Sequence, residues 1–294
     1  MIAAGFSLQP DDEFLERCAA LIDEVDCYEV TPETLWFERG DGKLVDNGFF
    51  RRFLALRERS GKPFVAHGVG VSMATDSAMD RPRRRRWLAR VARDHQVFRF
   101  GWWTDHLGAS ALDGLATTLP VPLPPTSHAA GVVRRRLRAM QRVVPDVGVE
   151  NNVGYFFPGD PLDEARFLGG CLAGRRTWLL LDLHNLYTMA QNLGFDTDAW
   201  LARVDLGRVI EIHLAGGRPS NARWLPTRRV MRLDSHDDAV PEPVWALLDR
   251  VLPRCPNLRL VTLERMEGTV LRPPDASALR GELRRMRRAL RRYG

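Results

Sequence analysis

The stretch WLLLDLHN, residues 178–185, is an apolar run that ends in a carboxylate, a histidine and an amide. Such a run predicts a buried strand, and the carboxylate of Asp182 leaves that strand at a point where it needs a cation or strong hydrogen-bond donors. The pattern repeats along the chain: Glu150 ends VGVE, His213 ends VIEIH, and Glu264 ends LVTLE. The sequence therefore predicts several buried strands that each end in a residue able to bind a metal ion.

Short apolar segments alternate with helical patterns along nearly the whole chain. The expected strands are 2–7, 26–30, 63–67, 97–102, 147–150, 178–182, 209–213 and 258–263. The expected helices are 12–22, 49–59, 83–94, 129–143, 161–172, 197–203 and 243–252, with a closing helix over 275–292. This α/β order, without repeat or long linker, predicts a single (β/α)8 TIM barrel over residues 1–294. A doubly wound sheet is the alternative, but it usually has fewer strands and no need for polar residues on so many of them.

The candidate site residues lie at or just after the C-terminal ends of the expected strands, the face on which barrel enzymes build their active sites. They are His67, His106, Glu150, Asp182, His213 and Glu264, joined by Asp234 and His236 of the string LDSHDD. A D-x-H spacing in extended chain puts both side chains on one face. Imidazoles and carboxylates that arrive from many strands are the ligands that a cluster of hard-to-borderline metal ions needs. The alternative for each acid alone is a buried salt bridge with an arginine, but this would require a separate coincidence at every strand end.

Some neighbours of these residues leave two interpretations open. His184 and Asn185 follow Asp182, and we expect only one of the two to face the cluster. Glu211 precedes His213 on the same strand face, where it could orient a metal ligand. The segments 119–125 and 216–233 are expected to be long loops over the same face of the barrel.

The composition is that of a soluble globular protein, with 45% hydrophobic and 27% charged residues. No apolar run approaches the roughly 20 residues of a membrane span, and the first residues lack the basic flank of a signal peptide. The cysteines, which are Cys18, Cys27, Cys171 and Cys255, form no CxxC pair, and this argues against a disulfide framework. We therefore expect a cytoplasmic protein.

The net charge of +6 reflects arginine runs within 81–87, 132–138 and 283–293. We interpret these runs as solvated outer faces of helices. Nucleic acid, an acidic partner protein and an acidic peptide are the alternatives that such charge leaves open. Of these, nucleic acid is not the partner that we expect.

Several strings in a fixed order resemble one family closely: HGVGVS, TDHL, ENN, LLLDLHNLYTMAQNLGFD, EIHLAGG and LDSHDDAVPEPVW. The family is that of the multinuclear non-heme iron-dependent oxidative enzymes, long catalogued as a domain of unknown function. It belongs to the xylose-isomerase-like barrel superfamily, together with endonuclease IV. The resemblance runs from about residue 5 to residue 264. The chain departs from the common pattern at three places. Residue 184 is histidine where asparagine is usual, and residues 104–105 are Thr-Asp where Ser-Glu is usual. A further histidine is common where this chain has Gln191 or Leu193.

The resemblance implies three metal positions, filled by two to three iron ions in a mixed-valent Fe(II)/Fe(III) state. The implied ligand sets are His67, His106 and Glu150; a bridging Glu150 with Asp182, His213 and Glu264; and Asn185, Asp234 and His236. Among these residues, Glu150, Asp182 and His213 would carry catalysis. The neutral amide oxygen of Asn185 suits iron better than zinc, and endonuclease IV has a histidine at that place in its zinc site.

The resemblance also implies an oxidoreductase that uses dioxygen to modify a ribosomally synthesised peptide, commonly at a cysteine residue, in natural-product biosynthesis. A small partner protein usually presents the peptide. The alternative is an endonuclease IV-like, zinc-dependent phosphodiester hydrolase acting on abasic DNA, for which three metal ions and a basic surface would serve. A sugar isomerase would need a lysine near the metal, and the only lysines, Lys43 and Lys62, do not lie at a later strand end.

Overall fold

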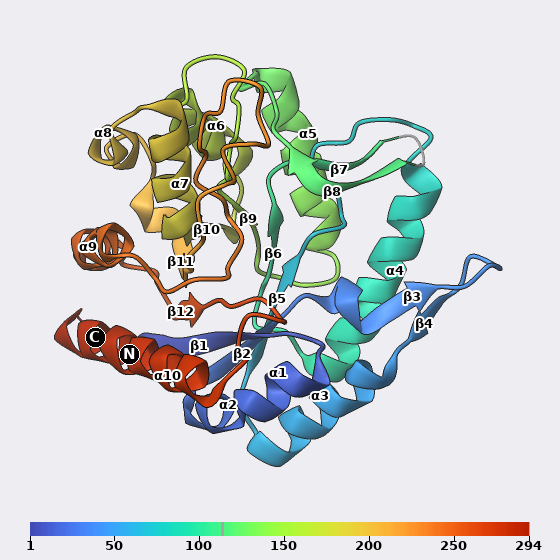
Figure 1. Ribbon diagram of the computed structural model, residues 1–294. Coiled ribbons are helices and arrows are strands. Elements are labelled where there is room, and N and C mark those ends of the chain that lie inside the picture. The colour runs from blue at the N-terminus through green and yellow to red at the C-terminus, as the bar shows by residue number, and fades with distance from the viewer. Residues whose placement is uncertain (113–114, 294) are drawn as a thin grey trace.

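Eight parallel strands form a closed barrel in the computed structural model, which describes residues 1–112 and 115–293 (Figure 1). Each barrel strand pairs with the next barrel strand along the chain, and the last pairs with the first. The strands β1, β2, β5, β6, β9, β10, β11 and β12 cover Ala3–Leu8, Cys27–Val30, Phe64–Gly68, Trp103–His106, Val147–Glu150, Thr177–Asp182, Val209–Leu214 and Leu260–Leu263. The predicted (β/α)8 barrel is confirmed.

The strands are buried because helices cover the outside of the barrel and side chains fill its inside. Every residue of β9, β11 and β12 is buried, and this explains the apolar runs in the sequence. The helices α1 to α10 cover Asp12–Arg17, Ala19–Glu24, Gly48–Ser60, Arg81–Phe98, Ser127–Met140, Asp163–Cys171, Leu183–Leu193, Thr197–Leu201, Glu242–Val251 and Pro273–Tyr293. Short 3-10 turns lie at Pro32–Leu35, Leu206–Arg208 and Leu252–Arg254.

Helix α7 begins directly at the end of β10 and is absent from the predicted helices. Asp182 is its N-cap, and the carboxylate of Asp182 accepts a hydrogen bond from the backbone N–H of Asn185 at 2.7 Å. Gly194 ends the helix in the left-handed conformation, with a φ of 78°. His184 and Asn185 in the first turn of α7 are buried, whereas Gln191 near its end is exposed. The helix follows β10 without an intervening loop, so no turn residue marks in the sequence where the strand ends and the helix begins.

Strand β6 begins later than predicted. The predicted strand 97–102 is wrong, because α4 continues through Phe98 and ends at Arg99, which has a φ of 52°. The buried rings of Phe98 and Phe100 stack on one another with centroids 5.5 Å apart. This apolar run therefore fills the core from a helix end and a turn, which periodicity alone does not distinguish from a short strand.

Three other segments differ from the prediction. The predicted helix 12–22 is divided at Cys18 into α1 and α2. Two antiparallel hairpins were not predicted, and they pair β3 (Trp36–Glu38) with β4 (Leu44–Asp46) and β7 (Ala109–Leu112) with β8 (Leu115–Val121). Strand β8 includes the start of the predicted loop 119–125, whereas 216–233 is an irregular loop as predicted.

The arginine runs lie in the outer helices α4, α5 and α10, as predicted. Several of these arginines form ion pairs with acids of their own or neighbouring elements, such as Arg84 with Asp80 and Arg287 with Asp26. Much of this positive charge is therefore matched locally. In the described part of the chain, no helix combines the length and the apolar character that a membrane span requires.

Candidate metal centre

The predicted ligands come together at the end of the barrel where its strands finish. The strands β5, β6, β9, β10 and β11 carry, in that order, His67, His106, Glu150, Asp182 and His213 at their C-terminal ends. Glu264 follows β12, and Asn185 lies in the first turn of α7. Asp234 and His236 lie in the loop between β11 and α9. His106, His236 and Asp234 are the most exposed of these residues, with side-chain fractions of 25%, 18% and 13%, and Glu264 follows with 10%.

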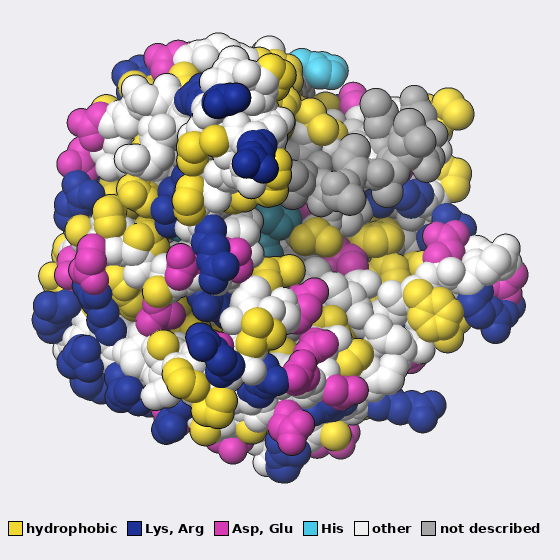
Figure 2. Space-filling view, in the orientation of Figure 1, with side chains coloured by type: hydrophobic (Ala, Val, Ile, Leu, Met, Phe, Trp, Pro, Cys, Tyr) yellow, Lys and Arg dark blue, Asp and Glu magenta, His cyan; other side chains and the backbone are white. Residues whose placement is uncertain are grey.

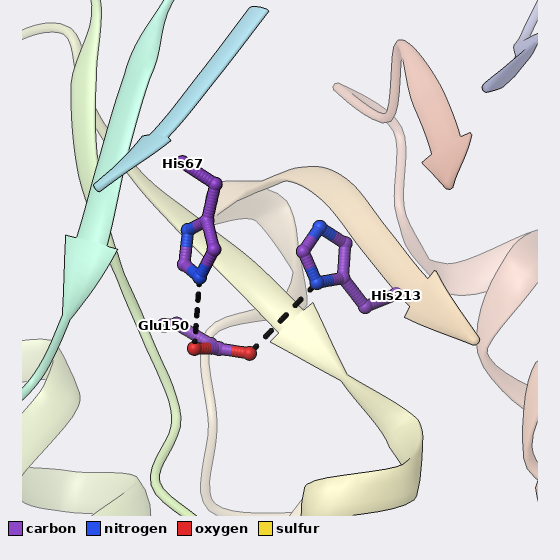
Figure 3. Close-up of side chains that lie close together, drawn as sticks. All are labelled: His67, Glu150 and His213. Atoms are coloured by element: carbon purple, nitrogen blue, oxygen red, sulfur yellow. Dashed lines mark ion pairs between the residues drawn. The ribbon is translucent and has the colours of Figure 1, made fainter. Parts of the chain in front are cut away.

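The carboxylate of Glu150 lies between two sets of donors. Its Oε2 atom is 2.7 Å from Nδ1 of His106 and 3.3 Å from Nε2 of His67. Its Oε1 atom is 3.9 Å from Nδ1 of His213 and accepts a hydrogen bond from the side-chain amide of Asn185 at 3.2 Å. Figure 3 shows the rings of His67 and His213 pointing toward the carboxylate of Glu150, each linked to a different oxygen. This is the arrangement that a carboxylate shared by two metal ions needs.

Nδ1 of His213 is surrounded by carboxylates. It is 3.0 Å from Oε2 of Glu264, 3.9 Å from Oε1 of Glu150 and 4.0 Å from Oδ2 of Asp182. Two buried atoms here, Oδ2 of Asp182 and Oδ1 of Asn185, have no hydrogen-bond partner among the described residues. A buried polar atom without a partner costs about 1–3 kcal/mol. Coordination of cations would satisfy these atoms, and the nitrogen and oxygen donors therefore fit a metal centre.

A second group of donors surrounds Asp234. Its Oδ1 atom is 2.8 Å from Nε2 of His236 and 2.9 Å from Nδ1 of His184. The other ring nitrogen of His236, Nδ1, is 3.7 Å from Oε2 of Glu264, so that Glu264 joins this group to the group around His213. The two groups form one continuous cluster.

Asn185 lies on the Glu150 side of this cluster. Its amide nitrogen donates hydrogen bonds to Oε1 of Glu150 and to the backbone carbonyl of Asn151, each at 3.2 Å. The expectation that only one of His184 and Asn185 faces the cluster is wrong. Adjacent residues on a helix diverge by about 100°, and the cluster is wide enough for both side chains to reach it.

The imidazoles that face the cluster are held from behind by other side chains. Nδ1 of His67 is 3.0 Å from Oγ1 of Thr104, and Nε2 of His213 is 2.8 Å from Oε2 of Glu29. Glu29 lies on β2 and is 1% exposed. Partners of this kind fix the orientation and the tautomer of a histidine that binds metal.

Sequence reasoning missed Glu29, although a single charge in the buried strand CYEV is a signal that could have identified it. Glu211, which was predicted to orient a ligand, is 3.7 Å from Nε2 of His213. Its carboxylate accepts hydrogen bonds from Nε1 of Trp102 at 2.7 Å and from the hydroxyl of Thr262 at 2.6 Å. Glu211 thus lies near the ring of His213, but Glu29 makes the shorter contact.

The ENN string positions Asp182 as well as Glu150. The side chain of Asn151 accepts a hydrogen bond from the backbone N–H of Asp182 at 2.8 Å and donates one to its carbonyl at 3.0 Å. The carboxylate oxygen Oδ1 of Asp182 is engaged by the start of α7, and Oδ2 is left facing the cluster.

The charges of the cluster perturb one another. Burial raises the pKa of Asp182 well above its ordinary value, and the charges of Glu150 and Asp234 raise it further. Burial would lower the pKa of His106, but Glu150 outweighs this effect and raises that pKa to about 9. His236 shows the same balance, with Asp234 as its main partner and a pKa of about 10. Protons on these imidazoles thus neutralise the buried carboxylates, and a bound cation would replace them.

A pocket of about 260 Å³ opens over the cluster, and His106 and Asp234 form part of its wall. The rest of the lining is largely apolar or aromatic and includes Val69, Pro120, Val121, Pro122, Val153, Tyr155 and Phe156. Figure 2 shows a histidine side chain at the bottom of a hollow on this face. The pocket therefore offers a largely apolar route from the surface to the cluster.

Comparison with known proteins identifies the family. The model of the RiPP precursor modification enzymes MbnB/TglH/ChrH matches residues 3–291. A UPF0276 protein of Pseudomonas aeruginosa is 31% identical over 272 residues, which cover 92% of this chain and 86% of that protein. Endonuclease IV from Thermus thermophilus is similar in structure, with a TM-score of 0.52 and 17% identity over 96% of this chain and 97% of that one. A xylose isomerase domain protein from Planctomyces limnophilus has a TM-score of 0.56 and 14% identity, over 99% and 97% of the two chains. The likeness to these two structures shows the fold alone, which is the xylose-isomerase-like barrel. The chain itself belongs to the MbnB/TglH/ChrH family of RiPP precursor modification enzymes, as its sequence strings predict.

Proposed function

We propose that this chain is an oxidoreductase that holds two to three iron ions in a mixed-valent state and uses dioxygen to modify a ribosomally made precursor peptide at a cysteine. The observation that carries the proposal is the concentration of buried nitrogen and oxygen donor atoms around Glu150 and His213. Membership of a family that modifies precursor peptides supports the peptide substrate. The donors are nitrogen and oxygen atoms, a set that suits iron.

The contacts divide the ligands into positions around Glu150. His67 and His106 would hold one ion together with Oε2 of Glu150, because both rings approach that oxygen. His213 would hold a second ion together with Oε1 of Glu150, and Asp182 and Glu264 would complete its ligands. Asp234 and His236 lie at a third position, to which the family resemblance also assigns Asn185.

Bound iron would supply the electrons and the open coordination positions with which dioxygen is activated. The side chains of the protein would hold the ions in place and exclude water. Glu150 would help to hold both ions, since each of its oxygens lies near a different set of ligand residues. Asp182 presents one oxygen to the centre because the N-terminus of α7 occupies the other, and Glu29 keeps Nδ1 of His213 turned inward. The apolar pocket would shield a cysteine side chain from water near the cluster.

A basic loop at the rim of the pocket would contact the peptide. The segment 216–233 leads into Asp234, contains no acidic residue and carries Arg218, Arg223, Arg228, Arg229 and Arg232. It also exposes Trp224, at 66%, and Val230, at 52%. The exposed guanidinium groups of Arg223 and Arg228, next to these apolar side chains, suit an acidic peptide segment, which a small partner protein would help to present.

The test needs a candidate substrate, which is a short cysteine-containing peptide sought among the genes that neighbour the gene for this chain. Anaerobically purified protein is mixed with the peptide, and dioxygen is then admitted. The expected result is a change in mass that maps to a cysteine, requires dioxygen and is absent with Glu150→Ala. Bound zinc without a redox response, together with cleavage of abasic DNA, would contradict the proposal and favour the hydrolase.

A further inference from the structure

His184 is buried at the edge of the metal cluster, and none of the ligand sets considered so far includes it. Its ring is completely buried in the first turn of α7. Nδ1 of His184 and Nε2 of His236 lie 2.9 Å and 2.8 Å from the same oxygen, Oδ1 of Asp234. One donor atom from each of these residues lies within 4.8 Å of the other two. Two imidazoles thus converge on one carboxylate.

The ring of His184 is held in the same way as the rings of His67 and His213. In each of those two, one nitrogen contacts a supporting side chain, Thr104 or Glu29, and the other faces the cluster. Nε2 of His184 faces the hydroxyl of Thr188 at 3.4 Å, and its Nδ1 faces Asp234. A hydroxyl that accepts a hydrogen bond from Nε2–H would leave the lone pair of Nδ1 free to bind metal.

The loop over the cluster passes close to this ring at Gly217. A Cβ atom at Gly217 would lie 3.1 Å from Cε1 of His184 and 2.1 Å from the carbonyl oxygen of Leu233. The second of these distances is a clash with backbone. The course of the loop therefore brings Asp234 and His236 against His184.

We propose that His184 is a metal ligand, and that it forms the third cation position together with Asp234 and His236. Two imidazoles and one carboxylate are a donor set that suits Fe(II) and leaves coordination positions open. Asp234 also lines the pocket, so these positions would face a bound substrate. Asn185, whose amide contacts Glu150, would belong to the central group instead. This inference rests on the proposed iron centre and assigns its third position.

The test compares His184→Ala and His184→Leu with the wild-type protein, because neither replacement can bind a metal ion. His128→Ala is the matched control, because His128 lies in α5 with a side chain that is 78% exposed. Each protein is stripped of metal, reloaded anaerobically with Co(II), and analysed for ions per chain and for the affinity of the weakest ion. In both His184 variants we expect the loss of one ion, or a loss of affinity larger than the about 10- to 100-fold that removal of an orienting partner causes. The control should bind like the wild type.

Proton NMR of the Co(II) proteins separates a ligand from a positioning residue. A histidine bound to Co(II) gives a strongly shifted resonance from its remaining ring N–H. The wild-type spectrum should contain one such resonance that disappears in both His184 variants. An unchanged affinity, or a weaker affinity without loss of a resonance, would overturn the assignment of His184. A wild-type protein that binds no metal would instead refute the proposed iron centre.

Discussion

Replacement of Glu29 would remove a negative charge from behind the ring of His213. Glu29 does not face the proposed ions, but its Oε2 atom is 2.8 Å from Nε2 of His213, and its side chain is buried. In Glu29→Gln a neutral amide oxygen can still accept a hydrogen bond from that nitrogen. In Glu29→Ala both the charge and the hydrogen bond are lost. The pair of variants therefore separates the effect of the charge from the effect of the contact.

The expected loss of metal affinity follows from the role of Glu29 in orienting the ring of His213. Loss of a partner that orients a metal-binding histidine weakens metal affinity by about 10- to 100-fold, which corresponds to about 1.4–2.8 kcal/mol. Hydrogen bonds to a charged group are about twice as strong as neutral ones. We therefore expect about 10-fold weaker binding in Glu29→Gln and about 100-fold in Glu29→Ala. The weakening should be confined to one ion, because His67 is supported by Thr104 instead.

The assay is an anaerobic Fe(II) titration in competition with a chromophoric chelator. Glu211→Gln is the matched control, since Glu211 is buried and lies 3.7 Å from the same nitrogen of His213. Its carboxylate is engaged by Trp102 and Thr262, so this variant should lower the free energy of unfolding and change metal affinity less than Glu29→Gln. Affinity of Glu29→Ala within twofold of the wild type, or a larger effect of Glu211→Gln, would refute the reasoning.

Three further predictions concern the centre and its support. Glu150→Ala should remove two ions at once, because both groups of ligands share this carboxylate; full metal content by elemental analysis would contradict the bridge. Asn151→Ala loses two hydrogen bonds to the backbone of Asp182 and should lower the free energy of unfolding in urea by about 1–3 kcal/mol. In metal-free protein, neighbouring carboxylates raise the folded-state pKa of His106 to about 9 and of His236 to about 10. Both values exceed the pKa of about 6.5 that histidine has in the unfolded chain. The protonated rings therefore contribute their full stabilisation to the fold below about pH 6.5. This stabilisation should disappear as pH rises through 9 to 10 in a urea series, and metal-loaded protein should not show the loss.

The barrel could be predicted because buried parallel strands form apolar runs that end in polar residues. The strand 147–150 has the predicted bounds, and β10 and β11 differ from their predictions by one residue at one end. Helix α7 and the start of β6 could not be predicted from these runs. Helix α7 follows β10 without a loop between them, and the apolar residues before β6 are buried by a helix end and a turn.

The predicted ligands were found as a set because strand ends of a barrel meet at one face. The contacts that support the set depend on how distant segments meet. Glu29 and His213 lie 184 residues apart and touch only because β2 and β11 belong to the same closed barrel. The ring of His184 reaches Asp234 because the loop after β11 folds back over α7, with Gly217 close to the ring. Neither contact leaves a local pattern in the sequence.

The central claim is that the buried cluster around Glu150 and His213 holds redox-active iron. The most direct measurement is metal analysis of protein purified anaerobically from iron-replete cells, with Mössbauer spectra of the same sample. We predict two to three iron ions per chain and signals from both Fe(II) and Fe(III). Protein that contains two or three zinc ions per chain, and whose spectra do not respond to reductant or dioxygen, would contradict the claim.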